Sequence, residues 1–488
     1  MAAKRKKDFR VLEKIPVTNY AAEGKSLGKT DGKIVFIEGG AVPGDIVDVR
    51  LYKNKKDWAE GKAVFFHAYS KDRVQPFCAH FGTCGGCQWQ MLPYEKQLFY
   101  KQQQVTDVLH HIGKLALPDT SPIIGADETK FYRNKLEFTF SNRSYLSEEE
   151  IKDKGFYQKD ALGFHLPRLF DKILDIHTCY LQAEPSNKIR NTVRAFALQK
   201  GYSFYDHRAQ TGWLRNLIIR TTTTGEVMVI LCLHHEDEEE RKALLNHLLQ
   251  QVPEITTLLY IINPKKNDSI ADLHPEVYYG KGYILEKLGQ YTFKIGPKSF
   301  FQTNTRQAEK LYNVVRTFAG LRGSETVYDL YCGAGSIGIF ISENAKKVIG
   351  VEQIAEAVKH AKENALLNHI NGMEFFEGDV IDICTDVFFA QHGKADVVIT
   401  DPPRAGMHER LISRLLEMEA PRIIYVSCNP ATQARDLIKL CEKYTVEKIQ
   451  PVDLFPHTQH IENVVLLKKI KNNAETQGIS SQKQTGDK

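Results

Sequence analysis

The 488-residue sequence lacks any long hydrophobic run. No stretch approaches the roughly 18–20 consecutive apolar residues that a membrane-spanning helix needs, so we expect no membrane contact. The basic start MAAKRKKDFR is not followed by an apolar segment, so it does not match a secretory signal. These absences favour a globular, cytoplasmic protein. The length predicts more than one domain.

The sequence also lacks a strong charge imbalance, because 65 basic residues face 60 acidic ones and the net charge is only +5. An excess this small says little about partners. The distribution says more, since residues 4–7, 53–56 and 130–143 are locally basic. Such clusters suit nucleic acid, and TKFYRNK (129–135) mixes basic and aromatic side chains in a way that suits RNA. An ordinary solvated surface explains each cluster equally well.

A disulfide framework is not expected for the nine cysteines of a cytoplasmic chain, so those that cluster point to metal binding or catalysis. Cys78, Cys84 and Cys87 follow the pattern C-x5-C-x2-C, with glycines between them that let the backbone wrap a metal centre. Cys179 lies far along the chain as a candidate fourth ligand. Four thiolates suit either structural zinc or an iron–sulfur cluster, and the spacing leaves both open.

The predicted elements indicate a multidomain α/β protein with three regions and a tail. Short strands separated by turns over residues 8–68 predict an OB-like β-barrel, a fold often used on nucleic acid. Residues 75–295 indicate a mixed α+β domain carrying the cysteines, and we expect its helix at about 93–115 to pack on the domain that follows. Alternating strands and helices over 296–470 predict a Rossmann-like, doubly wound parallel sheet. The polar tail 471–488 is expected to be disordered.

A glycine-rich turn opens the alternating region. In DLYCGAGSIG (329–338), Gly333, Gly335 and Gly338 form G-x-G-x-x-G between a predicted strand and a predicted helix. Glycines there permit a tight turn and close approach of a ligand to the backbone. Glu352 ends the next strand, where it can accept hydrogen bonds from ribose hydroxyls. The pattern predicts a nucleoside-bearing cofactor, although helix–strand packing alone would also use such glycines.

Two acidic positions distinguish between the possible cofactors. NAD is the first candidate from the glycines, but a dinucleotide site does not require Asp329 before the turn or the strand end Asp-Pro-Pro-Arg at 401–404. An acidic residue beside the turn can instead hold the amino group of a methionine moiety. S-adenosylmethionine therefore fits this sequence better than NAD.

VSCNPATQ (426–433) places Cys428 between an apolar strand and a proline that stops the strand. Strand ends of a doubly wound sheet meet at one edge, so Cys428, Asp329, Glu352 and Asp401 are predicted to converge there. A thiolate adding to carbon 6 of a pyrimidine makes carbon 5 able to attack a methyl donor. A base must then take the carbon-5 proton, and Glu462 is the candidate. A buried structural cysteine and a solvated carboxylate are the alternatives.

The motifs DLYCGAG, DPPRAG, SCNPAT, the H-x-E at 460–462 and FFQTN at 300–304 resemble the bacterial RNA (uracil-5-)-methyltransferases over nearly the whole chain. The β-rich start looks like the TRAM domain of that family, an RNA-binding OB-like barrel. The resemblance implies that Cys428 is the nucleophile, that Glu462 is the base, and that Asp401 and Arg404 contact the target base. RNA cytosine-5 methyltransferases usually carry a second cysteine where this chain has Arg404, which favours uracil.

The resemblance also extends the set of residues expected around S-adenosylmethionine. Ser336 is the least secure member, since some relatives carry Asn there. The complete set of cofactor-binding positions expected from the turn and from the resemblance is Gln302, Asp329, Tyr331, Gly333, Ser336, Glu352, Asp379 and Asp401.

The ribosomal-RNA branch of this family has the same cysteine spacing and a [4Fe-4S] cluster, whereas the transfer-RNA branch generally lacks both the cluster and the TRAM domain. The resemblance therefore implies methylation of carbon 5 of a specific uridine in 23S ribosomal RNA. A monomer is the default expectation, since the sequence does not indicate an oligomer. The spacing differs from the C-x3-C-x2-C of radical enzymes. Three alternatives remain: a tRNA uridine-5 methyltransferase, an RNA-binding ribosome-assembly factor with incidental methylation, and an iron–sulfur redox sensor.

Overall fold

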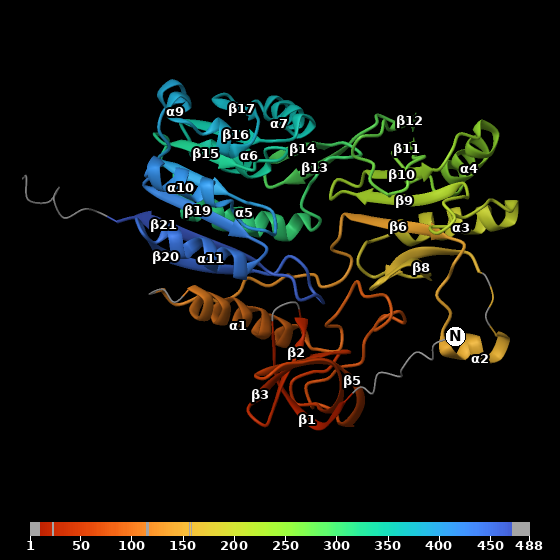
Figure 1. Cartoon of the computed structure of the whole chain (residues 1–488). Coiled ribbons are helices and arrows are strands. Elements are labelled where there is room, and N and C mark those ends of the chain that lie inside the picture. The colour runs from red at the N-terminus through yellow and green to blue at the C-terminus, as the bar shows by residue number, and fades with distance from the viewer. Residues whose placement is uncertain (1–9, 22–23, 114–116, 156, 158, 471–488) are drawn as a thin grey trace, which may run out of the picture. The chain divides into compact units, whose positions relative to one another are not determined.

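The computed structural model describes residues 10–21, 24–113, 117–155, 157 and 159–470 (Figure 1). The basic residues 4–7 and the predicted disordered tail 471–488 lie outside these described residues. Within the described chain, internal contacts define two compact units. The first unit comprises the described residues of Met1–Gln104, Ile123–Lys310 and Asp453–Ile461, and the second those of Val105–Pro122, Leu311–Val452 and Glu462–Lys488.

The first unit begins with a closed five-stranded barrel in the order β1-β2-β3-β5-β4. Alternating apolar residues such as Ile15, Val17, Val47 and Val49 fill its interior, as the period of two in a half-buried strand requires. The predicted OB-like barrel is thus confirmed. Its strands are β1 (Val11–Tyr20), β2 (Ser26–Thr30), β3 (Lys33–Glu38), β4 (Ile46–Asn54) and β5 (Trp58–Ala68).

A seven-stranded mixed sheet follows in the same unit, in the order β12-β11-β10-β9-β6-β7-β8. Strands β9 and β10 form an antiparallel hairpin around residues 224–225. The strands are β6 (Lys135–Ser141), β7 (Ala161–Leu166), β8 (Leu169–Asp175), β9 (Leu214–Thr221), β10 (Val227–Leu233), β11 (Thr257–Ile262) and β12 (Glu276–Tyr279), with a separate hairpin of β13 (Ile284–Leu288) and β14 (Tyr291–Ile295).

Helices α3 and α4 contribute to the core of this sheet through Ile189, Val193, Leu244 and Leu248. Helix α4 has three glutamates in its first turn, and Asp237 caps it by accepting a hydrogen bond from the Glu240 amide at 3.1 Å. The helices of this part of the chain are α1 (Tyr94–Gly113), α2 (Glu148–Lys154), α3 (Ser186–Lys200), α4 (Glu238–Gln251) and α5 (Thr305–Ala319), of which α1 and α5 run across a unit boundary.

The second unit contains a seven-stranded sheet in the order β17-β16-β15-β18-β19-β21-β20. All neighbouring pairs from β17 to β19 are parallel, as predicted, and β21 runs antiparallel to both of its neighbours. The strands are β15 (Thr326–Leu330), β16 (Lys347–Glu352), β17 (Met373–Glu377), β18 (Val397–Thr400), β19 (Arg422–Ser427), β20 (Tyr444–Val452) and β21 (Glu462–Lys469).

The strand order reverses between β15 and β18, where β15 is followed by β16 on one side and β18 on the other. Ligands of doubly wound folds bind beside the carboxyl ends of the strands at such a reversal. The helices of the second unit are α6 (Ser336–Ile341), η2 (Ser342–Asn344), α7 (Ala355–Leu367), α8 (Val380–Ile383), α9 (Asp386–His392), α10 (Glu409–Met418) and α11 (Pro430–Leu440).

Among the described residues, none of the helices is both long enough and apolar enough to cross a membrane. The predicted domain boundaries at 68–75 and 295–296 remain predictions.

Candidate active site

The glycine turn joins β15 to α6 and is tied to Asp329. The Gly338 amide donates to Asp329 Oδ2 at 2.9 Å, and a Cβ on residue 338 would lie 2.9 Å from the same oxygen. Glycine at 338 therefore allows the backbone to reach the carboxylate. The other oxygen, Oδ1, is buried and has no hydrogen-bond partner in the described structure. A buried acceptor without a donor is costly, so this oxygen suits a ligand that brings a donor.

The two aspartates at the reversal of strand order, Asp329 and Asp401, both have raised pKa values. Burial raises the pKa of Asp329 to about 7, and the charges of Asp401 and Glu352 raise it too, while the Gly338 hydrogen bond opposes the rise. Burial likewise raises the pKa of Asp401 to about 7. A cationic group placed between these carboxyls would be attracted to both, as the ammonium of a methionine moiety would be.

The remaining predicted cofactor residues of the second unit lie on the same turn or at neighbouring strand ends. The Glu352 carboxylate accepts from the Gly333 amide at 3.0 Å and from the Ile354 amide at 2.9 Å, which links the ends of β15 and β16. Tyr331 adopts φ +63°, a left-handed conformation that is uncommon for a tyrosine. Burial raises the pKa of Tyr331 to about 12, and the charge of Asp379 adds to this effect.

Two of the predicted positions are engaged in local contacts. Asp379 caps α8 by accepting from the Ile381 amide at 2.9 Å. The Ser336 hydroxyl lies 2.9 Å from the hydroxyl of Tyr312, a fully buried residue that the sequence did not single out. Gln302 belongs to the first unit, where its carbonyl accepts from Asn134 Nδ2 at 2.8 Å. Its predicted role at the cofactor remains a prediction.

The pairing of β19 with β21 brings Cys428 and Glu462 to facing positions. Ser427 is paired with Asn463 across this antiparallel ladder. Cys428 follows Ser427 and Glu462 precedes Asn463, so the register places the thiol and the carboxylate opposite each other at one end of the sheet. The sequence could not show this pairing, because it depends on which strand lies beside β19.

Electrostatic effects couple four of the predicted residues, Cys428, Glu462, Asp401 and Arg404. Burial raises the pKa of the Cys428 thiol to about 11, with further raising by Glu462 and Asp401 and lowering by Arg404. Glu462 is only 6 % exposed, and burial and Asp401 hold its pKa well above the usual value while Arg404 lowers it. Glu462 is therefore not the solvated carboxylate that its position before an apolar strand would usually produce.

A polar network holds the turn at Cys428. The Ser427 hydroxyl accepts from the Asn429 amide at 3.1 Å, and Asn429 Oδ1 caps α11 through the Ala431 amide at 3.1 Å. Pro430 occupies the first turn of α11, where its missing N–H is not needed. The sequence predicted the strand end and the proline stop. It gave no sign of the buried amides behind them, Gln433 and Asn463, because polar residues in a helix and a strand are ordinarily assigned to the surface.

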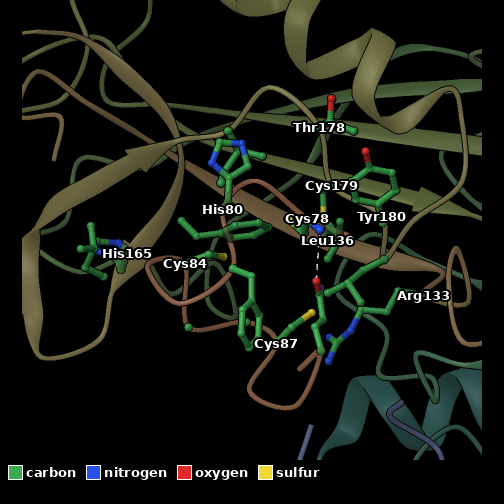
Figure 2. A pocket seen from close by; sticks show the side chains of 18 of the residues that line it. Cys78, His80, Cys84, Cys87, Arg133, Leu136, His165, Thr178, Cys179 and Tyr180 are labelled. Carbon is green, nitrogen blue, oxygen red and sulfur yellow. Dashed lines mark hydrogen bonds between the residues drawn. The ribbon is translucent and has the colours of Figure 1, made fainter. Parts of the chain in front are cut away.

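The four predicted metal ligands line one cavity of about 460 Å³ in the first unit, shown in Figure 2. This cavity, lined by Cys78, Cys84, Cys87 and Cys179, is called the cysteine cavity below. The Cys78 amide donates to Gln90 Oε1 at 3.2 Å, and the Cys179 amide donates to Asn187 Oδ1 at 2.8 Å. Residues 78–87 and Cys179 thus converge although they are distant in sequence.

Burial raises the pKa of three thiols of the cysteine cavity, those of Cys84, Cys87 and Cys179. Burial raises the pKa of Cys84 to about 11 and of Cys87 to about 12, and nearby cysteines raise both further. All four cysteines are soft donors, and a metal ion bound by them would stabilise their thiolates. However, no three His, Cys, Asp or Glu side chains of the described residues are close enough together to form a metal site. The predicted cluster is therefore not shown.

Two known sequence families match different parts of the chain. The pattern of the tRNA (Uracil-5-)-methyltransferase family matches residues 209–470, which is more than half of the chain. The chain belongs to this family. The pattern of the TRAM domain matches residues 14–64, the barrel of the first unit. The predictions of an S-adenosylmethionine-dependent RNA uracil-5 methyltransferase family and of a TRAM domain are thus confirmed.

Relatives that match over nearly their full length are named RNA methyltransferases. A protein of Bacteroides thetaiotaomicron named "Uncharacterized RNA methyltransferase" is 53 % identical over 451 residues, which cover 92 % of this chain and 99 % of that protein. A protein of Chlorobaculum tepidum with a similar name is 40 % identical, with 93 % of this chain and 96 % of that protein covered.

One solved structure resembles this uracil-5 methyltransferase family member along most of its length. It is the Pyrococcus abyssi tRNA (uracil-54, C5)-methyltransferase in complex with S-adenosyl-L-homocysteine. The TM-score is 0.71 at 26 % identity, and the match covers 93 % of this chain and all of that one.

Proposed function

We propose that this enzyme methylates carbon 5 of a specific uridine in 23S ribosomal RNA, with S-adenosylmethionine as donor and a covalent adduct between Cys428 and uracil carbon 6. The observation that carries the proposal is the register of β19 and β21, which sets Cys428 opposite Glu462. A nucleophile and a base on facing positions are what addition at carbon 6 and proton removal at carbon 5 require.

The cofactor residues are proposed on the geometry of the glycine turn. In this proposal Asp329 offers its unpaired Oδ1 to the amino group of the methionine moiety, and Glu352, which is bonded to the Gly333 amide, accepts from the ribose hydroxyls. S-adenosylmethionine, when bound at this turn, supplies the methyl group. The residues proposed to surround it are those predicted from the sequence: Gln302, Asp329, Tyr331, Gly333, Ser336, Glu352, Asp379 and Asp401.

The reaction proceeds in two stages on the chain's own side chains. The Cys428 thiolate forms a bond to carbon 6, and carbon 5 then forms a bond to the methyl carbon as the bond between that carbon and the donor sulfur breaks. Arg404 favours the thiolate, since it lowers the pKa of Cys428. In the second stage, ionised Glu462 takes the proton from carbon 5, the double bond between carbons 5 and 6 re-forms, and the bond between carbon 6 and sulfur breaks to release the Cys428 thiolate.

Burial works against the second stage in the free enzyme, because it favours protonated Glu462. Arg404 opposes this effect, and the same guanidinium assists both the nucleophile and the base. We propose that Arg404 and Asp401 also contact the uracil, which would place the substrate among the four interacting groups.

The ribosomal substrate is supported by the four cysteines and the TRAM barrel, which resemble the ribosomal-RNA branch. Transfer RNA is the second candidate, because the Pyrococcus abyssi protein that matches nearly the whole chain is named a tRNA methyltransferase. The deciding experiment measures 5-methyluridine by nucleoside mass spectrometry in 23S fragments and in tRNA, from cells with and without the gene. Loss from a 23S fragment alone supports the proposal. Loss from tRNA alone assigns the second candidate, and no loss in either contradicts methylation.

We further propose that the cysteine cavity holds a [4Fe-4S] cluster, with zinc as the alternative. The support is the donor set, four cysteines that line one cavity. The cluster would be held by Cys78, Cys84, Cys87 and Cys179 and would stabilise the surrounding chain as well as their thiolates. Iron, zinc and acid-labile sulfide measured on anaerobically purified protein distinguish the two metals. We propose a cytoplasmic monomer, and size-exclusion chromatography with light scattering tests the monomer.

A further inference from the structure

Helix α11 begins two residues after Cys428 and carries polar residues on two of its faces. Gln433 and Asp436 are buried, whereas the Arg435 side chain is 54 % exposed. Neither Gln433 nor Arg435 was predicted from the sequence to take part in the site. Gln433 bonds to the strands that carry Cys428 and Glu462, whereas Arg435 bonds to the loop after β18.

The first face of α11 connects the strands that carry the nucleophile and the base. Gln433 Nε2 donates to the Tyr425 carbonyl at 3.0 Å and to the Asn463 carbonyl at 3.3 Å. Asn463 Nδ2 donates to Gln433 Oε1 at 2.8 Å. Tyr425 lies on β19 three residues before Cys428, and Asn463 directly follows Glu462. Gln433 on α11 thus connects β19 to β21 near the ends that carry Cys428 and Glu462. The side-chain amides of Gln433 and Asn463 are both fully buried.

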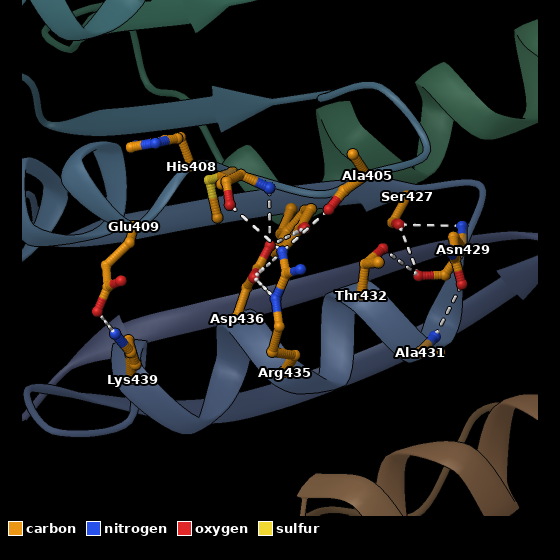
Figure 3. Close-up of polar contacts among 12 residues, drawn as sticks. Ala405, His408, Glu409, Ser427, Asn429, Ala431, Thr432, Arg435, Asp436 and Lys439 are labelled. Carbon is orange, nitrogen blue, oxygen red and sulfur yellow. Dashed lines mark hydrogen bonds and ion pairs between the residues drawn. The ribbon is translucent and has the colours of Figure 1, made fainter.

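The second face of α11 holds the loop after β18 (Figure 3). Arg435 Nη2 donates to the carbonyls of Ala405 at 3.0 Å and Met407 at 3.3 Å. The Met407 amide donates to Asp436 Oδ2 at 2.8 Å. Near the start of the helix, Asn429 Nδ2 donates to the Arg404 carbonyl at 3.0 Å.

The loop lies against this face too closely for a side chain at its turn. Gly406 adopts φ +78°, and a Cβ there would lie 2.6 Å from Arg435 Nη2 and 2.7 Å from Asp436 Oδ2. Asp436 Oδ2 also accepts from the Tyr425 hydroxyl at 2.7 Å. The loop, the helix and β19 therefore meet at one buried carboxylate.

We propose that α11 sets the geometry of the active site in two separable ways. Gln433 positions the Cys428–Glu462 pair, and Arg435 positions the loop that presents Arg404 to the RNA base. The inference rests on the proposed function of Cys428, Glu462 and Arg404. Gln433 and Arg435 do not contact the reacting atoms, so both are positioning residues.

The test separates the two roles kinetically. With unmodified transcripts of 23S RNA and tRNA as probes, Gln433→Met should lower the single-turnover methylation rate at saturating RNA about 100-fold, because a displacement of about 1 Å between reacting groups costs that much. Its KM for RNA should stay within about threefold of wild type. Arg435→Ala should instead raise KM about tenfold and lower the single-turnover rate much less than Gln433→Met does, because the displaced Arg404 contacts the base as well as assisting the thiolate. Arg435→Lys, which keeps one donor, should give an intermediate KM.

Matched variants control for the loss of similar side chains elsewhere. Asn263→Ala removes another fully buried amide, one that bonds only within its own loop of the first unit. Arg414→Ala removes a surface arginine of α10 that pairs with Glu417. Both should keep wild-type kcat and KM. Thermal unfolding of every variant identifies any that fail to fold, and Arg435→Ala, being half-exposed, decides the inference if Gln433→Met does not fold.

The outcomes distinguish this inference from the proposed function. If wild type methylates a transcript and both α11 variants match their controls, the positioning role is wrong and the proposed function stands. The same holds if both variants lower kcat and raise KM alike, since that is loss of structure without separable roles. If wild type methylates no RNA and forms no adduct with 5-fluorouridine transcripts, the proposed function fails and the inference fails with it.

Discussion

Cys428 and the cysteine cavity both contain thiols whose pKa burial raises, but the two sites surround these thiols with different groups. In both places burial raises the thiol pKa, to about 11 for Cys428 and for Cys84. At Cys428 the neighbours are two carboxyls and Arg404, whereas around Cys84 they are other cysteines. A thiol beside a base and a guanidinium can be ionised briefly and released again. Thiols that raise each other's pKa need a bound cation to stay ionised, which suits a permanent structural role.

The largest expected effect is at the first of these thiols. Cys428→Ala should lower methylation at least about 1,000-fold, because the pathway through carbon 6 is lost. RNA affinity should stay within about threefold. Transfer of radiolabelled methyl groups measures the first quantity and filter binding the second. A variant that retained substantial activity would show that Cys428 is not the nucleophile.

Glu462→Gln should leave the first stage possible and block the second. Methylation turnover should fall about 100- to 10,000-fold, in the range expected for loss of a general base. A covalent protein–RNA adduct should accumulate and survive on denaturing gels. Glu409→Gln is the control, since Glu409 is an exposed residue of α10 that pairs with Lys439. Absence of an adduct in Glu462→Gln, with wild type active, would argue against Glu462 as the base.

A substitution in the cysteine cavity should change bound metal and stability, unlike the substitutions at Cys428 and Glu462, which change methylation. Cys87→Ser should lower bound iron at least about twofold and lower the unfolding temperature by several degrees, because metal binding contributes to folding. Cys441→Ser should leave both unchanged, as Cys441 ends α11 and is not among the residues that line the cavity. Elemental analysis and calorimetry provide the measurements. Equal metal content in the two variants would contradict the proposed cluster.

The smallest expected effect is a difference in alkylation between Cys428 and the cavity thiols, measured in wild-type protein. The thiolate is the species that iodoacetamide alkylates, and the pKa of Cys428 lies at about 11. Its alkylation rate should therefore rise about tenfold per pH unit between about pH 7 and pH 9, since the thiolate fraction rises so below the pKa. Arg404→Gln should slow the reaction at every pH in this range, because Arg404 lowers that pKa. Peptide mass spectrometry follows each cysteine, and the cavity thiols should stay unmodified until the metal is removed.

The sequence predicted what short motifs determine. The turn around Gly333, the strand end before Cys428 and the barrel followed from local spacing and alternation, and the structure contains all three. The burial of Glu462 and its position opposite Cys428 depend on a strand pairing between segments far apart in the chain. Gln433 and Asn463 were missed for the same reason, since nothing in their local sequence marks them as buried.

The insertion of β21 between β19 and β20 has a consequence for how the protein matures. Strands β19 and β20 come earlier in the chain but are neighbours of β21 and not of each other. As the chain emerges from the ribosome, two strand edges must wait with open hydrogen-bonding groups until residues 462–469 arrive between them. The strand that closes this gap is also the one that begins with Glu462. A nascent chain therefore acquires its proposed base only when its sheet is completed. An incompletely synthesised enzyme that formed a covalent adduct with RNA would lack the carboxylate needed to release it.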